Sequence, residues 1–281
     1  MNPTSQTSLT ELVDAWAASA ADLRSVAAEV DEEGWRGPSA LPGWSVGDVV
    51  AHVAWIERHL LGLVDPPHQP DWDALPHATS LLSRATETPV DLRRTWPRAQ
   101  VMAEFDAAVA AREEALRSGP QDPQTPSIDP FGRPKSLAAV LRMRIFDCWV
   151  HSQDVRWAVG RPGLGAPSGA RLTAEQIAGG LGFVWGKRVG APAGSTLTVH
   201  VTEPGIALTH SVGVGADGRG GPVAEPESPT VTLTMSFDDF VQLSCGRQWP
   251  DSSTEDARSR VEVSGDADLA VRTLDSFNIA P

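Results

Sequence analysis

The stretch Arg144-Ile-Phe-Asp-Cys-Trp-Val-His-Ser-Gln-Asp154 decides how the first half of this chain is interpreted. It is an apolar, helix-patterned run in which Asp147 and His151 are four residues apart. On a helix this spacing stacks the carboxylate and the imidazole one turn apart on one face, where both can reach one cation. A further ligand is available in His52, which lies in the helix-patterned segment Trp44–Trp55.

Two histidines and one carboxylate from two helices make a metal site with three protein ligands. Such a site leaves coordination positions open, as catalytic rather than structural centres do. An alternative stays open, because Arg144 and Asp154 share the same helical stripe and any surface helix has a polar face. His52 could likewise be a satisfied core histidine, since valines surround it.

Two neighbouring residues are less suited to this site. His59 lies on nearly the same helix face as His52 but about 10 Å further along the axis, so it is the weaker substitute. Cys148 points about 100° away from Asp147 and is predicted to be a packed core thiol. The other cysteine, Cys245, is far away in sequence. We expect both cysteines to be reduced.

Hydrophobic periodicity predicts four helices in the first half of the chain. Capping boxes at Ser8 and Ser45 open the first two. Arg112 interrupts the apolar stripe of the third helix, and a polar, proline-bearing segment at 66–97 holds at most a short helix near 80–84. The four helices are predicted at about 8–30, 45–63, 98–117 and 136–159. Their long connections favour a four-helix bundle with the metal site in or at the mouth of its core.

The second half has a different composition. The glycine-rich segment Gly160–Gly169 is predicted to be a hinge or linker, and Gly213–Gly221 a hairpin loop. Alternating β-branched runs predict strands at 196–202, 206–212, 230–236 and 260–263, and periodicity predicts helices at 173–189, 237–245 and 266–277. We therefore expect an α+β protein of two domains, 1–162 and 170–281. The first is a helical bundle, and the second is a small α+β domain with a mostly antiparallel sheet.

Composition excludes several classes of function. The net charge of −13 argues against nucleic acid and anionic membranes as partners, because both require clustered Lys and Arg. No apolar run approaches the ~20 residues of a membrane span, and no signal peptide is visible. We expect a soluble, cytoplasmic protein. The chain has no Tyr, so a phenol is not available as a general acid.

Two segments resemble one protein family. The segment Leu41-Pro-Gly-Trp-Ser-Val-Gly-Asp-Val-Val-Ala-His52 is similar to a signature of the DinB-like, mycothiol-dependent maleylpyruvate isomerase family, and Arg144–Arg156 resembles its second signature, R-x-x-E/D-x-x-x-H-x-x-D. Gly160–Gly163 is also typical of the family. The resemblance covers essentially the whole chain and implies a metal-binding bundle followed by a sterol-carrier-like domain. The segments Leu243–Arg247 and Val263–Asp266 resemble motifs of that second domain, but they are less specific than the two N-terminal signatures.

The resemblance implies a set of metal ligands. These are His52, Asp147 and His151, with zinc as the usual divalent ion. The founding isomerase has Glu where this chain has Asp147, and the shorter side chain leaves the identity of the metal open. Many relatives have Glu at the position of Ser152, which is a further departure from the family pattern.

The resemblance also implies residues around the metal. Asp154 is predicted to orient His151 or to hold a polar group of the cosubstrate. Arg247 resembles a family arginine that faces the active site from the C-terminal domain. We therefore predict Asp154 and Arg247 as catalytic residues, and Arg144, Asp154 and Arg247 as residues that bind the cosubstrate.

The implied chemistry is thiol activation. A cation with an open position can bind the thiol of mycothiol as a thiolate, which lowers a thiol pKa of ~8.5 below neutrality. The thiol then adds to a small-molecule electrophile, either in thiol transfer or in cis–trans isomerisation of a maleylpyruvate-like substrate. Two alternatives remain: a metal-dependent biosynthetic enzyme that uses no thiol, and a non-catalytic protein that binds an apolar ligand. The sequence does not indicate an oligomeric state.

Overall fold

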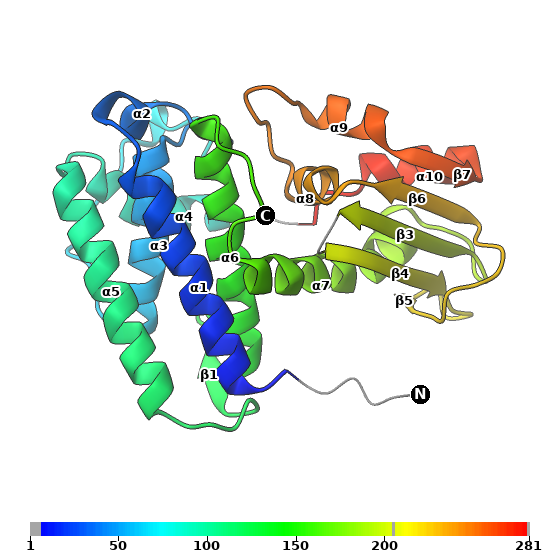
Figure 1. Ribbon diagram of the computed structural model, residues 1–281, viewed down its shortest axis with the longest axis horizontal. Helices are drawn as coiled ribbons and strands as arrows, with labels where there is room; N and C mark the ends of the chain where they lie inside the picture. Colours follow the sequence, from blue (N-terminus) through cyan, green and yellow to red (C-terminus); the bar gives the residue numbers. More distant parts are fainter. Residues whose placement is uncertain (1–6, 204–205, 280–281) are drawn as a thin grey trace. The chain divides into compact units, whose positions relative to one another are not determined.

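The computed structural model describes residues 7–203 and 206–279, in two compact units, Met1–Ala170 and Arg171–Pro281. The N-terminal unit is a helical bundle (Figure 1). Its long helices are α1 (Leu9–Ala28), α3 (Val46–Leu60), α5 (Arg98–Ser118) and α6 (Leu137–Ala158). These confirm the four predicted helices. Ser8 and Ser45 form the predicted capping boxes, each with the residue three positions further on.

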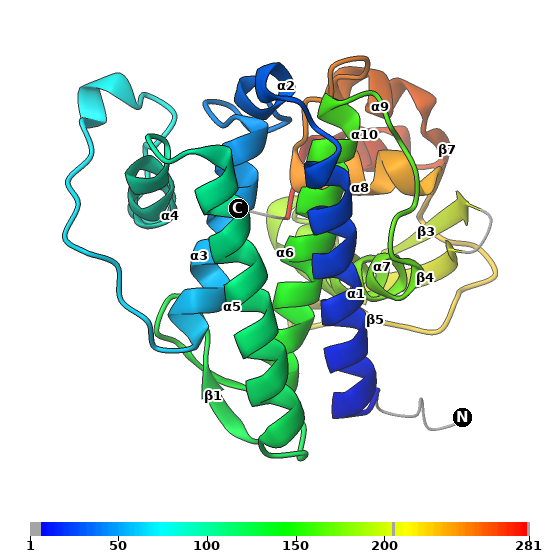
Figure 2. The same ribbon diagram turned by 60° about the vertical axis from the view of Figure 1, so that its left-hand side comes forward.

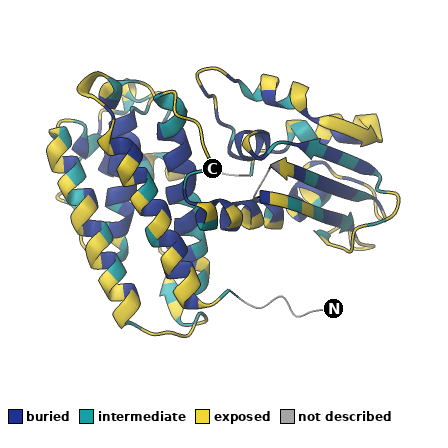
Figure 3. Ribbon diagram, in the orientation of Figure 1, coloured by how far each residue is buried: buried dark blue, intermediate teal, exposed yellow. Residues whose placement is uncertain are grey.

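The bundle core lies between the inner faces of these helices. Helix α1 packs mainly against α6, and α3 packs mainly against α5. Figure 3 shows α1 and α5 buried along one side and exposed along the other, as expected for amphipathic helices. Trp16 of α1 and Trp149 of α6 are among the largest fully buried side chains. Helix α6 is buried over most of its length from Leu137 to Val155. This helix contains the stretch Arg144–Asp154, from which the helical bundle was predicted.

Several shorter elements were not predicted or, in the case of α4 (Leu81–Arg93), were predicted only in part. They are α2 (Glu32–Arg36), the 3-10 turn η1 (Trp72–Ala74), α4 and the hairpin of β1 (Pro126–Ile128) and β2 (Pro134–Ser136). The short helix predicted near 80–84 is the first turn of α4. Helix α4 continues through Pro89 and packs beside α3, as Figure 2 shows. The proline and the polar composition of this helix conceal it in the sequence.

The C-terminal unit is built on a five-stranded sheet with the order β5-β4-β3-β6-β7. Only the β3–β6 pair is parallel, so the predicted mostly antiparallel sheet is confirmed. The strands are β3 (Thr196–Glu203), β4 (Ile206–Val214), β5 (Gly220–Pro222), β6 (Val231–Met235) and β7 (Glu262–Gly265). The helices are α7 (Pro167–Phe183), which spans the boundary of the units and continues into the π-helical turn η2 (Val184–Arg188), α8 (Phe237–Cys245), α9 (Thr254–Arg260) and α10 (Ala267–Asp275).

Alternation of apolar and polar residues explains the core of the C-terminal unit. Leu197 of β3 pairs with Val231 of β6, and the buried residues two and four positions further along both strands also pair. One apolar face results, and α8 and α10 pack against β3 and β6. The predicted hairpin at Gly213–Gly221 joins β4 to β5. There Gly220 lies so close to Gly182 O that an added Cβ would be 2.0 Å away.

Two predicted boundaries were wrong. The strand expected at 260–263 begins at Glu262, because Arg260 ends helix α9 and pairs with Asp239 at 2.6 Å. The helix expected from Thr173 begins at Pro167, inside the segment predicted as a linker. Here Gly169 allows a close approach, since an added Cβ would be 2.2 Å from Ser19 Oγ. Within the described residues, no helix is both long enough and apolar enough to cross a membrane.

Candidate metal centre

Three side chains from α3 and α6 form a ligand cluster: His52, Asp147 and His151. One potential ligand atom from each lies within 4.8 Å of the other two. Asp147 Oδ1 is 3.7 Å from His52 Nε2 and 3.6 Å from His151 Nε2, which is longer than a hydrogen bond. Ligands with ~2.1 Å bonds to one zinc ion lie roughly 3–4 Å apart, so these residues fit a shared divalent cation.

The two imidazoles of the cluster are held in different ways. His151 Nδ1 lies 2.9 Å from Asp154 Oδ2, and Asp154 is fully buried. This contact leaves Nε2 of His151 on the side of Asp147. His52 Nδ1 is buried and has no hydrogen-bond partner among the described residues. The ring of His52 is held by packing, with its centroid 5.0 Å from Trp44 and 6.2 Å from Trp55.

The carboxylate of Asp147 has two different oxygens. Oδ2 accepts a hydrogen bond of 2.7 Å from Arg144 Nη1, while Oδ1 faces both histidines. Arg144 is 1% exposed and also donates from Nε to Glu57 Oε1 at 2.8 Å. The side chain of Asp147 is 23% exposed and is therefore the most accessible member of the ligand cluster.

Burial and charge set the protonation of the ligand cluster. Burial lowers the pKa of His52, and Asp147 opposes this only in part. Burial acts in the same direction on His151, but the carboxylates of Asp147 and Asp154 outweigh it and raise its pKa. For Asp147, burial is outweighed by Arg144 and the histidines, so its pKa lies well below the usual range. An ionised carboxylate and a neutral imidazole are the forms that bind a metal.

The remaining predicted residues lie outside the ligand cluster. His59 is exposed and stacks on Trp55 with centroids 5.4 Å apart. Arg247 belongs to the C-terminal unit, where it is 8% exposed and donates from Nη1 to Cys245 O at 3.0 Å. The predicted catalytic role of Arg247 and its predicted contact with a cosubstrate stay predictions. The same holds for the predicted cosubstrate contacts of Arg144 and for the catalytic role of Asp154.

The prediction for Cys148 is confirmed. Its side chain is fully buried, and burial raises the thiol pKa well above the usual value. Cys245 is also buried, and both cysteines are free.

Several residues around the ligand cluster were not predicted. The ring of Trp44 packs near both histidines in a tilted orientation, with centroids 5.0 Å from His52 and 6.4 Å from His151. The Nε1 atom of Trp44 donates to the buried Glu87 at 2.6 Å, and Glu87 lies in the part of helix α4 beyond the predicted first turn. Glu57 is also fully buried. Its signal in the sequence is a carboxylate on the apolar stripe of α3, four residues after Val53.

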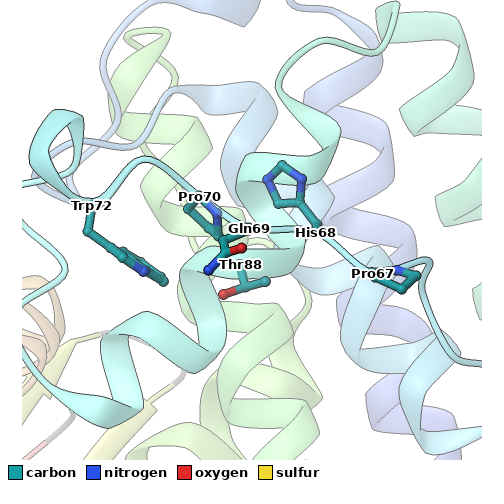
Figure 4. Close-up of a pocket in the computed structure, with 6 residues that line it drawn as sticks. All are labelled: Pro67, His68, Gln69, Pro70, Trp72 and Thr88. Carbon is teal, nitrogen blue, oxygen red and sulfur yellow. The ribbon is translucent and has the colours of Figure 1, made fainter.

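A separate pocket lies between the segment that connects α3 to α4 and helix α4 itself (Figure 4). Its volume is about 440 Å³, and no member of the ligand cluster lines it. The residues that line it are Pro67, His68, Gln69, Pro70, Trp72 and Thr88. The candidate site of this chain is therefore the ligand cluster and not this pocket.

Sequence comparison places the bundle in a known family. The model of the mycothiol maleylpyruvate isomerase N-terminal domain matches residues 16–156. The chain belongs to the mycothiol-dependent maleylpyruvate isomerase family. The family match includes all three members of the ligand cluster. Two uncharacterised proteins of Mycobacterium tuberculosis, from strains H37Rv and CDC 1551, are each 23% identical to this family member over 139 residues. That alignment covers 50% of the chain, and the chain spans about half the length of these curated relatives.

Solved structures show the same fold over nearly the whole chain. The crystal structure of the mycothiol-dependent maleylpyruvate isomerase matches with a TM-score of 0.55 and covers 92% of this chain and 94% of its own, at 17% identity. A histidine-to-alanine mutant of that isomerase matches equally well. At this identity the likeness establishes the fold of this family member, namely a helical bundle followed by an α+β unit.

Proposed function

We propose that this chain is a metal-dependent enzyme that activates the thiol of mycothiol for addition to an electrophilic small molecule. The observation that supports the proposal is the ligand cluster, in which one carboxylate oxygen faces two imidazole nitrogens. The chain that contains this cluster belongs to a family of mycothiol-dependent isomerases. His52, Asp147 and His151 would hold the ion, with zinc as the proposed metal. A bound divalent cation supplies Lewis acidity, which lowers the pKa of a thiol from ~8.5 to below neutrality.

Neighbouring side chains fix the orientation of the proposed metal ligands and limit their exposure to solvent. Asp154 holds His151, and Arg144 holds Asp147, so two ligands are fixed from behind. Trp44 and Trp55 flank His52, whose side chain is 7% exposed. The exposed edge of Asp147 is the point where solvent, and by our proposal the cosubstrate, reaches the ligand cluster.

Two reaction outcomes are compatible with this site. In an isomerisation, the thiolate of the cosubstrate adds to an activated C=C bond and forms a C–S bond, while the electron pair moves to the conjugated carbonyl. The former double bond then rotates as a single bond, and elimination returns the thiolate. In a transfer, the C–S bond persists and the carbon takes up a proton. We propose small-molecule electrophiles as substrates in both cases. Location in the cytoplasm stays a prediction.

The test is elemental analysis of the purified chain and of His52→Ala, followed by incubation with mycothiol and maleylpyruvate or other electrophiles. We expect about one transition-metal ion per wild-type chain, consistent with a three-ligand site, and none in the variant. The helical circular dichroism of the variant should be retained, because an open three-ligand site is not needed for folding as a zinc finger is. His59→Ala is the control and should keep its metal.

A metal-free wild-type chain, even after reconstitution with divalent ions, would contradict the proposal. A metal-loaded chain that neither binds mycothiol nor consumes an electrophile in its presence would favour metal-dependent chemistry without a thiol. Loss of helical structure in His52→Ala would instead show that the histidine serves the core.

A further inference from the structure

One side chain from each long helix of the bundle meets in a buried polar layer. The four-helix polar layer consists of Trp16 from α1, Glu57 from α3, Arg112 from α5 and Arg144 from α6. None of the four residues is more than 8% exposed. Ionised groups are rarely buried in this way unless they are paired, because removing them from water is costly. Each charge of the layer therefore needs a partner within the bundle.

Glu57 is the centre of this layer. Its Oε1 accepts hydrogen bonds from Trp16 Nε1 at 3.0 Å and from Arg144 Nε at 2.8 Å. Its Oε2 lies 3.7 Å from Arg112 Nε, and among the described residues neither of these two atoms has a hydrogen-bond partner. Glu57 is thus the carboxylate that offsets two buried guanidinium groups.

Arg144 connects the layer to the ligand cluster. Its guanidinium donates from Nε to Glu57 and from Nη1 to Asp147 Oδ2. The group is planar and rigid, so fixing one edge on Glu57 also fixes where the other edge meets Asp147. As a result, Oδ2 of Asp147 is held by Arg144, and Oδ1 is left facing the two histidines.

We propose that Glu57 is a positioning residue of the metal centre: through Arg144, it makes Asp147 present a single oxygen toward His52 and His151. This inference rests on the proposed function, because it requires that the ligand cluster binds a metal. Glu57 does not itself belong to the cluster. Its effect on metal binding is therefore indirect.

The charge balance shows why Arg144 alone does not suffice. The guanidinium of Arg144 donates to Glu57, to Asp147 and to the weak acceptor Cys148. Without the charge of Glu57, Asp147 is the remaining carboxylate among these partners. Arginine and carboxylate groups favour two parallel hydrogen bonds, so Asp147 would turn both oxygens toward Arg144. That geometry competes with metal binding, whereas the native geometry allows it.

The experiment measures metal affinity in Glu57→Gln, which keeps the shape of the side chain and removes its charge. We expect the zinc Kd, measured by competition with a chromophoric chelator, to rise about 10–100-fold. The Co²⁺-loaded variant should also show a shifted visible absorption band, which a purely structural role of Glu57 would not produce. The matched control is Glu104→Gln, because Glu104 is a carboxylate of α5 paired with Arg58 and Arg93 away from the ligand cluster. This control should lose thermal stability and keep its zinc Kd.

Each outcome has a definite consequence. A Glu57→Gln chain with wild-type zinc affinity and an unchanged Co²⁺ spectrum overturns the inference alone and leaves the proposed function standing. A wild-type chain that binds no metal overturns both. If Glu57→Gln does not fold, Glu57→Asp keeps the charge but draws the carboxylate back from Arg144 Nε. A weakened zinc affinity in Glu57→Asp supports the inference, and an unchanged affinity overturns it.

Discussion

His151 is fixed through the nitrogen that does not face Asp147. Asp154 is fully buried, and its Oδ2 is within hydrogen-bond distance of Nδ1. Such a contact selects one tautomer and one ring orientation, and it makes the other nitrogen a better donor to a metal. Asp154 therefore acts on the ligand cluster without belonging to it.

We predict that Asp154→Asn raises the metal Kd about 10–100-fold, because the neutral amide holds His151 less strongly and no longer enforces its tautomer. Isothermal titration with zinc measures this change. The control is Asp91→Asn, since Asp91 Oδ2 contacts His68 Nε2 at 2.7 Å in a similar pair outside the ligand cluster. Equal affinities of Asp154→Asn and the wild-type chain would show that the contact is structural only.

The sequence predicts contacts between side chains on the same helix, because the helical period fixes their positions. Asp147 and His151 are one turn apart on a single helix, so their proximity follows from local geometry. The partnership of Glu57 with Arg144 spans 87 positions and depends on how α3 packs against α6. The sequence shows Arg112 as a charge on an apolar stripe, and Glu57 carries the same signal although it was not predicted; both side chains are buried.

Two of the glycines of helix α7, Gly169 and Gly179, lie in contrasting surroundings. An added Cβ at Gly169 would lie 2.2 Å from Ser19 Oγ and 3.0 Å from Trp149 Cδ1, whereas a Cβ at Gly179 meets no described atom within 4 Å. Gly169 is therefore needed for close packing, while Gly179 is not.

We predict opposite effects of alanine at these two sites. Gly179→Ala should stabilise the chain by roughly 0.5–1 kcal/mol, because alanine favours the helix and the site has space. Gly169→Ala should lower the melting temperature, since Ser19 and Trp149 would have to move. Thermal unfolding followed by circular dichroism measures both. A melting temperature of Gly169→Ala at or above that of the wild-type chain would contradict the packing argument.

The crossover between α3 and α5 is held by an ion-pair network. Asp65 accepts hydrogen bonds from Arg58 and from the fully buried Arg93, and both arginines also pair with Glu104. Burial alone would raise the pKa of Asp65, but the hydrogen bonds and charges of the arginines outweigh it and lower the pKa. The ionised form of Asp65 therefore stabilises the fold.

We predict that Asp65→Asn lowers the free energy of unfolding by about 1–3 kcal/mol at pH 7. Because the pKa is lower in the folded state, the stabilisation is full above the unfolded pKa of ~3.9 and is lost as the pH falls through the folded pKa. The difference between variant and wild type should thus shrink below about pH 4. Urea titrations across this range measure it. Asp106→Asn, at the exposed Asp106–Arg24 pair, is the control and should cost less than about 1 kcal/mol.

The predicted elements were right where periodicity is strong and wrong where a local signal dominates. Pro89 lies inside α4, and the glycine-rich segment before residue 170 contributes the first turn of α7. In both cases a residue that usually ends a helix is tolerated within it. The parallel pairing of β3 with β6 was also not predictable, because it joins strands that are separated by β4 and β5.

We predict that metal binding raises the free energy of unfolding of the chain. A ligand that binds only the folded state stabilises it by about 2.7 kcal/mol at 100 times its Kd. With roughly 2–4 °C per kcal/mol, the melting temperature should rise by about 5–10 °C.

A chelator should reverse the rise in melting temperature and leave the helical circular dichroism in place, because the four helices pack on one another through a buried apolar core. His52→Ala should respond to neither metal nor chelator. A metal-dependent shift that persists in this variant would place the ion elsewhere on the chain.

The four-helix polar layer also bears on how the bundle assembles. Apolar stripes alone would tolerate a shift of one helix along another by a turn, because each leucine or valine would take the position of the next one in the core. A slip of a single turn moves a side chain by about 5.4 Å, which is far beyond the reach of a hydrogen bond. Any misregistered bundle would therefore bury Glu57 or the arginines without their partners, at a cost of several kcal/mol. The layer thus excludes shifted pairings of the helices, and the same carboxylate that orients a metal ligand also selects the register of the bundle.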